Sequence, residues 1–74
     1  MDNNLEIKKL AKDSKVALWK LADFIGITEF TLSRRLRRPL SEEDAFLYKS
    51  IILHIRKEED GGKSFDEILE DWRK

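Results

Sequence analysis

Residues 18–38 constrain the fold of this chain more than any other segment. Apolar side chains recur at helical spacing over residues 18–25, and Gly26 follows the last of them. Glycine at that position favours a left-handed helix end. Thr28 then suits the N-cap of a second helix. The segment therefore predicts two short helices joined by a tight turn.

The flanking segments also predict helices, and no segment shows the sustained alternation of a strand. We expect one helix over about 3–13, a long central helix that Ser41 caps, and a terminal helix over 64–73. Pro39 is expected to end the third helix. The acidic residues 58–60 lie at a helix C-terminus, where the dipole disfavours them, and are expected to fray. The fold class is therefore all-α, with five helices in one domain over 1–74.

The formal net charge is zero, but the charges are distributed unevenly along the chain. Residues 1–40 carry nine Lys or Arg against five Asp or Glu, which gives +4, whereas residues 41–74 carry six against ten, which gives −4. This split favours a basic working face and an acidic remainder. No apolar run approaches the roughly 20 residues of a membrane span, and a cytoplasmic location is expected.

Signatures of catalysis and of cofactor binding are missing from the sequence. The chain has one histidine, no cysteine and no glycine-rich phosphate loop. We therefore expect a protein that is not an enzyme, holds no cofactor or metal, binds no small-molecule ligand and contacts no membrane.

Residues 18–38 resemble the helix-turn-helix of the lambda-repressor/Cro-like family. The matching residues are Ala22 where two helices cross closely, Gly26 in the turn, Ile27 after it, and Leu32 in the second helix. The runs Leu-Trp-Lys-Leu-Ala and Ser-Arg-Arg-Leu-Arg are similar to those of small regulators of Gram-positive phages and mobile elements. The resemblance implies a lambda-repressor-like domain that binds duplex DNA.

The family reads base edges from the start of the second helix. By position, this resemblance implies base contacts from Thr28, Glu29, Phe30, Thr31, Ser33 and Arg34. Phosphate contacts are expected from Lys20, Arg35, Arg37 and Arg38.

Structural roles compete with these assignments. Thr28 also serves as an N-cap, Glu29 can balance the helix dipole, and Phe30 is equally suited to cover the core. Arg35 stands where the family usually buries an apolar residue. Either the helix is rotated, or Arg35 points outward and Leu36 takes the core position. This alternative leaves open which arginines face DNA.

The terminal helix has one apolar stripe, which consists of Phe65, Ile68, Leu69 and Trp72. The stripe can close the core of the monomer against the fourth or first helix, or it can form a symmetric dimer interface. A homodimer fits the family, whose members read two half-sites about one DNA turn apart.

Three functions are compatible with these features. The favoured one is a sequence-specific transcriptional regulator of phage or mobile-element type that acts as a repressor. A protein-interaction module on the same scaffold is one alternative, and an architectural or recombination-directing DNA-binding factor is another.

Overall fold

The computed structural model describes the backbone of residues 3–73 and the side chains of residues 5–73. Within that part of the chain there are five helices and no strand, which confirms the all-α, five-helix prediction. The helices are α1 (Asn3–Asp13), α2 (Leu18–Ile25), α3 (Glu29–Arg35), α4 (Glu42–Asp60) and α5 (Phe65–Arg73). None of the helices so described is long and apolar enough to cross a bilayer.

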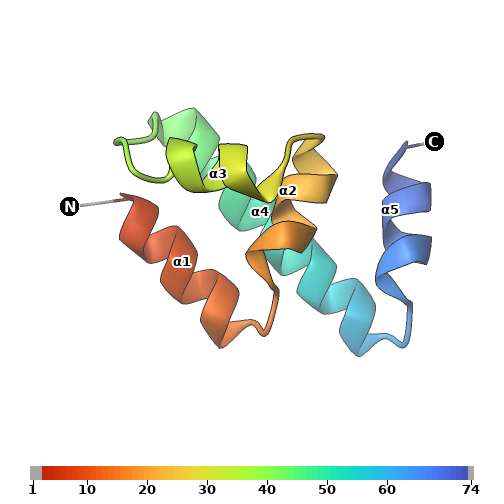
Figure 1. Cartoon of the computed structure of the whole chain (residues 1–74). Helices are drawn as coiled ribbons and strands as arrows, with labels where there is room; N and C mark the ends of the chain where they lie inside the picture. Colours follow the sequence, from red (N-terminus) through yellow and green to blue (C-terminus); the bar gives the residue numbers. More distant parts are fainter. Residues whose placement is uncertain (1–2, 74) are drawn as a thin grey trace.

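Helix α4 is the central packing element. It contacts α1, α2 and α5, while α3 packs against α2. Figure 1 shows α1 and α5 at opposite sides of the molecule, with α4 crossing between them. Each helix contributes to one core, whose largest fully buried side chains are Ile7, Leu21, Leu32, Ile52, Ile55 and Ile68.

Helix α3 ends earlier than Pro39 predicts. Its last residue is Arg35, and the amides of Arg37 and Arg38 donate to carbonyls three residues back, at 3.2 Å each. Such bonds tighten the chain beyond the helix end. Leu36 is only 3% exposed, so it takes the core position, while Arg35 is exposed. The second of the two alternatives for Arg35 is therefore confirmed.

The acidic end of α4 stays helical through Asp60, so the prediction that it frays is wrong. Lys20 of α2 donates to the Glu59 carboxylate at 2.6 Å. Glu58 lies 3.4 Å from the ammonium of Lys63. These cations supply the positive charge that the helix C-terminus favours, and they offset the charge of the acidic run.

Helix α5 closes the core of the monomer against α4, which is one of the two helices that the sequence left open, and also against α2. Ile68 is fully buried. The ring of Phe65 meets Trp19 edge-on at 5.2 Å, and Trp72 packs against Phe24 at 5.3 Å. Aromatic pairs at these separations attract beyond the area they bury.

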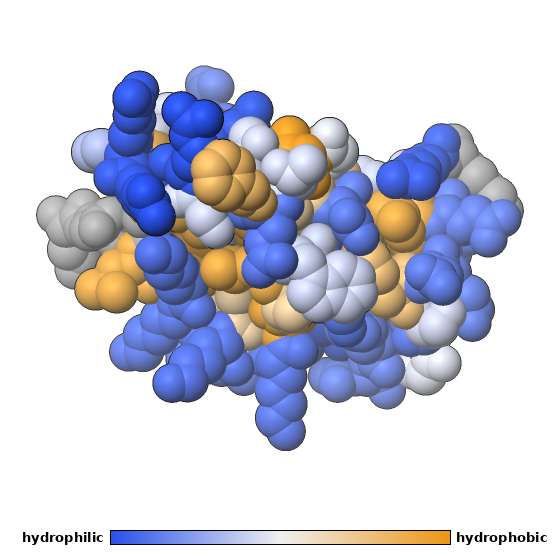
Figure 2. Space-filling model, viewed as in Figure 1, coloured by the Kyte–Doolittle hydropathy of each residue, from blue (hydrophilic) through white to orange (hydrophobic). Residues whose placement is uncertain are grey.

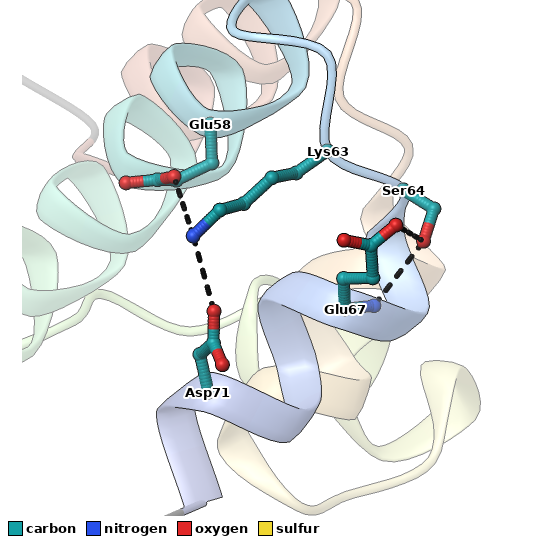
Figure 3. A network of polar contacts seen from close by, with 5 residues as sticks. All are labelled: Glu58, Lys63, Ser64, Glu67 and Asp71. Carbon is teal, nitrogen blue, oxygen red and sulfur yellow. Dashed lines mark hydrogen bonds and ion pairs between the residues drawn. The ribbon is translucent and has the colours of Figure 1, made fainter.

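Polar contacts hold the start of α5 (Figure 3). The ammonium of Lys63 lies 3.1 Å from Asp71 and 3.4 Å from Glu58, thereby bridging α4 and α5. Hydrogen bonds to Asp71 and then Glu58 raise the pKa of Lys63 above its ordinary value. The Ser64 hydroxyl accepts from the amide of Glu67 at 3.3 Å and thereby caps the N-terminus of α5.

Candidate nucleic-acid interface

The turn between α2 and α3 has the predicted left-handed residue. Gly26 has a φ of 90° and a ψ of 28°. The amides of Gly26 and Ile27 both donate to the carbonyl of Ala22, at 2.9 and 3.0 Å. A Cβ on Gly26 would meet nothing within 4 Å, so the backbone conformation rather than crowding favours glycine here. This geometry ends α2 and directs the chain into α3.

Thr28 caps α3, as predicted. Its hydroxyl accepts from the amide of Thr31 at 3.1 Å and donates to the Thr31 hydroxyl at 2.9 Å. Leu32 is fully buried and fixes which side of α3 faces the core. The cap and this one anchor leave Glu29, Phe30, Arg34 and Arg35 of α3 exposed to solvent.

The exposed side of α3 carries the residues assigned to base contact. Phe30 is 73% exposed, so the alternative in which it covers the core is wrong. The guanidinium of Arg34 lies 5.9 Å from the centre of the Phe30 ring, a cation–π contact. Glu29 is also exposed, while Ser33 and Thr31 are half-buried. The structure thus brings together the six predicted base-contact residues on one short helix and its cap.

Arginines line a shallow pocket of about 230 Å³ at the C-terminal end of α3. We call it the arginine pocket; its lining residues are Thr31, Arg34, Arg35 and Arg38. These residues are spaced at i, i+3, i+4 and i+7, which places them on one helical face. Arg37 does not line the pocket, so the predicted group of phosphate-binding arginines is divided by the fold.

A tyrosine of α4 orients one arginine of this pocket. The Arg35 guanidinium donates to the Tyr48 hydroxyl at 3.4 Å, and Tyr48 itself is only 3% exposed. Sequence reasoning missed Tyr48 as part of this site. Its position in the buried stripe of α4 indicates a core residue, and nothing local in the sequence pairs it with a residue 13 positions away.

Three arginines at this end of α3 are not paired with acidic side chains of the described residues. Among residues 5–73, no ion pair involves Arg34, Arg35 or Arg37. In Figure 2 the most hydrophilic side chains gather at the upper left, where Figure 1 places α3 and the turn after it. Such a group of guanidinium ions favours an anionic partner, because Arg binds phosphate and guanine in a bidentate manner.

Lys20 has an intramolecular partner instead of a free ammonium. Its contact with Glu59 is 2.6 Å long, and its side chain is only 18% exposed. The same ammonium lies 5.7 Å from the ring centre of Trp19 and 5.5 Å from that of Phe65. A phosphate would have to displace Glu59, so Lys20 is better placed to hold α2, α4 and α5 together.

The apolar stripe of α5 is mostly used inside the monomer. Ile68 is buried, and Phe65 and Leu69 are packed against the core. Trp72 remains 48% exposed. The structure therefore favours the core-closing alternative for this stripe, which leaves little apolar area for a dimer.

Comparisons of the chain with protein-family models, with curated proteins and with solved structures found no match. The described residues contain no cluster of His, Cys, Asp or Glu that could hold a metal ion.

Proposed function

We propose that α3 and the arginine pocket bind duplex DNA, with α3 entering the major groove. The observation that carries the proposal is the exposed guanidinium cluster at one end of α3, beside a short polar face. An α-helix fits the major groove, where base edges present distinct donors and acceptors. The resemblance of residues 18–38 to lambda-repressor/Cro-like proteins supports the same conclusion. A transcriptional regulator of the repressor type, acting as a homodimer, is the role that fits.

The α3 side chains divide into two expected roles. Arg34, with its guanidinium beside the exposed Phe30 ring, is placed to pair with guanine while Phe30 touches a thymine methyl. Arg37 and Arg38 follow the helix and suit phosphate contacts, which fix orientation without reading sequence. Arg35, held by Tyr48, suits a phosphate at the edge of the groove.

Salt dependence tests the electrostatic part of the proposal. Binding of a labelled duplex selected from a random library is measured by anisotropy between about 50 and 200 mM salt. If about six phosphates are neutralised per dimer, the log–log slope is near −5. A slope near zero would contradict DNA binding and favour the protein-interaction module.

Arginine variants separate the two roles. Arg34→Ala is expected to cost about 1–3 kcal/mol and to relax specificity at one base pair. Arg37→Ala should weaken binding to all sequences alike and reduce the salt slope by about 1. Arg73→Ala, an exposed arginine in the last turn of α5, is the matched control and should bind as the unmodified chain does.

The location of bound sites distinguishes a repressor from an architectural factor. A repressor is expected to select operators near promoters and to leave their curvature unchanged in a circular-permutation gel. Strong bending at the selected sites, without promoter proximity, would move the proposal to the recombination-directing alternative.

A further inference from the structure

An apolar stripe is left uncovered on the outer side of α4. Phe46, Leu47 and Leu53 are 74%, 45% and 48% exposed, although the helix is the centre of the fold. Ser50 lies between them, and its hydroxyl donates to the Phe46 carbonyl at 2.8 Å. Because Ser50 is small and its hydroxyl is already hydrogen-bonded within the helix, it adds little polarity to the stripe.

Opposite charges flank this stripe along the same line of α4. Glu43 precedes Ser50 by seven positions and Lys57 follows it by seven, so all three share a helix face. Leu47 and Leu53 lie three positions to either side of the same serine. Glu43 and Lys57 are exposed and form no ion pair with any residue from 5 to 73. The outer face thus reads, from one end to the other, acidic, apolar, small, apolar and basic.

We propose that this outer α4 stripe binds a second copy of the chain, with the two α4 helices antiparallel about a two-fold axis at Ser50. The stripe consists of Glu43, Phe46, Leu47, Ser50, Leu53 and Lys57. A two-fold interface brings the same patch of both copies together, so the patch must complement itself when reversed. Reversal about Ser50 sets each Glu43 opposite the other copy's Lys57, and each Leu47 opposite the other copy's Leu53.

The central serine supports close approach of the two helices. Helix axes pack 8–10 Å apart depending on the side chains at the contact, and a small residue allows the shorter distance. The α5 stripe cannot compete as an interface, because most of it already packs inside the monomer. The interface of the expected homodimer is therefore on α4 and not on α5, and it forms without DNA.

The oligomeric state of the full chain in solution is the test. Sedimentation equilibrium without DNA, from about 1 to 500 μM, should show a reversible monomer–dimer equilibrium, because an interface built on one helix pair is small and weak. Leu53→Glu should shift the chain to monomer. Leu5→Glu on α1 is the matched control, since Leu5 is 67% exposed but lies on another helix, and it should leave the equilibrium unchanged.

Charge reversal gives the sharper test. Glu43→Lys alone and Lys57→Glu alone each place like charges opposite one another, and each should weaken the dimer about tenfold. The double variant Glu43→Lys/Lys57→Glu restores opposite pairs and should recover most of the affinity. Circular dichroism verifies that each variant is folded.

Two results would overturn the proposal. One is a chain that stays monomeric over the whole concentration range. The other is a dimer that neither Leu53→Glu nor the single reversals weaken, which would place the interface elsewhere. Anisotropy with the duplex is measured separately on the same variants, so loss of the dimer and loss of DNA binding are distinguished.

Discussion

Helices α3 and α5 are both short, both capped by a hydroxyl side chain and both anchored by one fully buried aliphatic residue. They differ in what happens to their charges. On α5 and at the end of α4, acidic side chains accept from lysines within the molecule, as with Lys63 between Glu58 and Asp71. Three of the four arginines around the end of α3 form no ion pair with any described residue.

This difference separates charges that maintain the fold from charges that are available to a partner. Lys20 shows why sequence position alone does not make the distinction. It lies on a helix of the predicted DNA-binding unit, yet its ammonium is committed to Glu59 across 39 positions of sequence. Arg37, on the turn just after α3, forms no ion pair with any residue from 5 to 73.

The largest effect is expected from the two anchors. Leu32→Ala on α3 and Ile68→Ala on α5 each remove a fully buried side chain and should lower the free energy of unfolding by about 2–5 kcal/mol. Phe30→Ala is the control on α3 and should change it by less than about 0.5 kcal/mol, because Phe30 is exposed. Urea unfolding measures all three. If Phe30→Ala and Leu32→Ala lowered the free energy of unfolding equally, Phe30 would belong to the core. Helix α3 would then not have a single buried anchor as α5 does.

An intermediate effect is expected from the caps. Thr28→Ala and Ser64→Ala each remove an acceptor for an amide in the first turn and should cost about 1 kcal/mol of stability. If only α3 serves a partner, Thr28→Ala should also weaken duplex binding in the anisotropy assay, whereas Ser64→Ala should not. Thr28→Ser retains the hydroxyl and should restore both properties. Equal loss of binding in both alanine variants would mean that the two helices are not functionally distinct.

The smallest effect is expected from the Lys63 bridge. Its raised folded-state pKa means that the bridge contributes stability below the ordinary pKa of 10.5, and that this contribution is lost as pH rises through the folded value. Thermal melts should therefore show the unmodified chain losing more stability than Lys63→Met above about pH 10.5. Lys8→Met, another exposed lysine, should follow the unmodified chain. Parallel melting curves for Lys63→Met and the unmodified chain would show that the bridge contributes nothing.

Local signals in the sequence were sufficient to predict the five helices, although not where each of them ends. The cap at Thr28, the left-handed Gly26 and the apolar spacing of residues 18–25 each depend on residues no more than four positions apart. The structure bears out all three. The end of α3 was missed because Pro39 restricts only its neighbour, while the burial of Leu36 and the bonds from Arg37 and Arg38 stop the helix sooner.

Only part of the candidate site could be predicted from such local signals. Sequence position grouped the residues from Thr28 to Arg38, and α3 with its cap and following turn does carry them. Whether each of these side chains can contact a binding partner depends on residues far away in the sequence. Tyr48 orients Arg35, and Glu59 occupies Lys20. Neither pairing has a local signature, because the partners are 13 and 39 positions apart in sequence and approach only in the folded chain.

The sequence by itself determined the helix content, the turn at Gly26 and the basic cluster at the end of the third helix, because propensity, capping and periodicity are local properties. Tertiary structure decided which charges pair, that Leu36 rather than Arg35 enters the core, and that α5 packs on α2 and α4. It also decided which apolar side chains of α4 remain outside. Those outcomes depend on how helices far apart in sequence compete for one small core, and only the packed chain settles that competition.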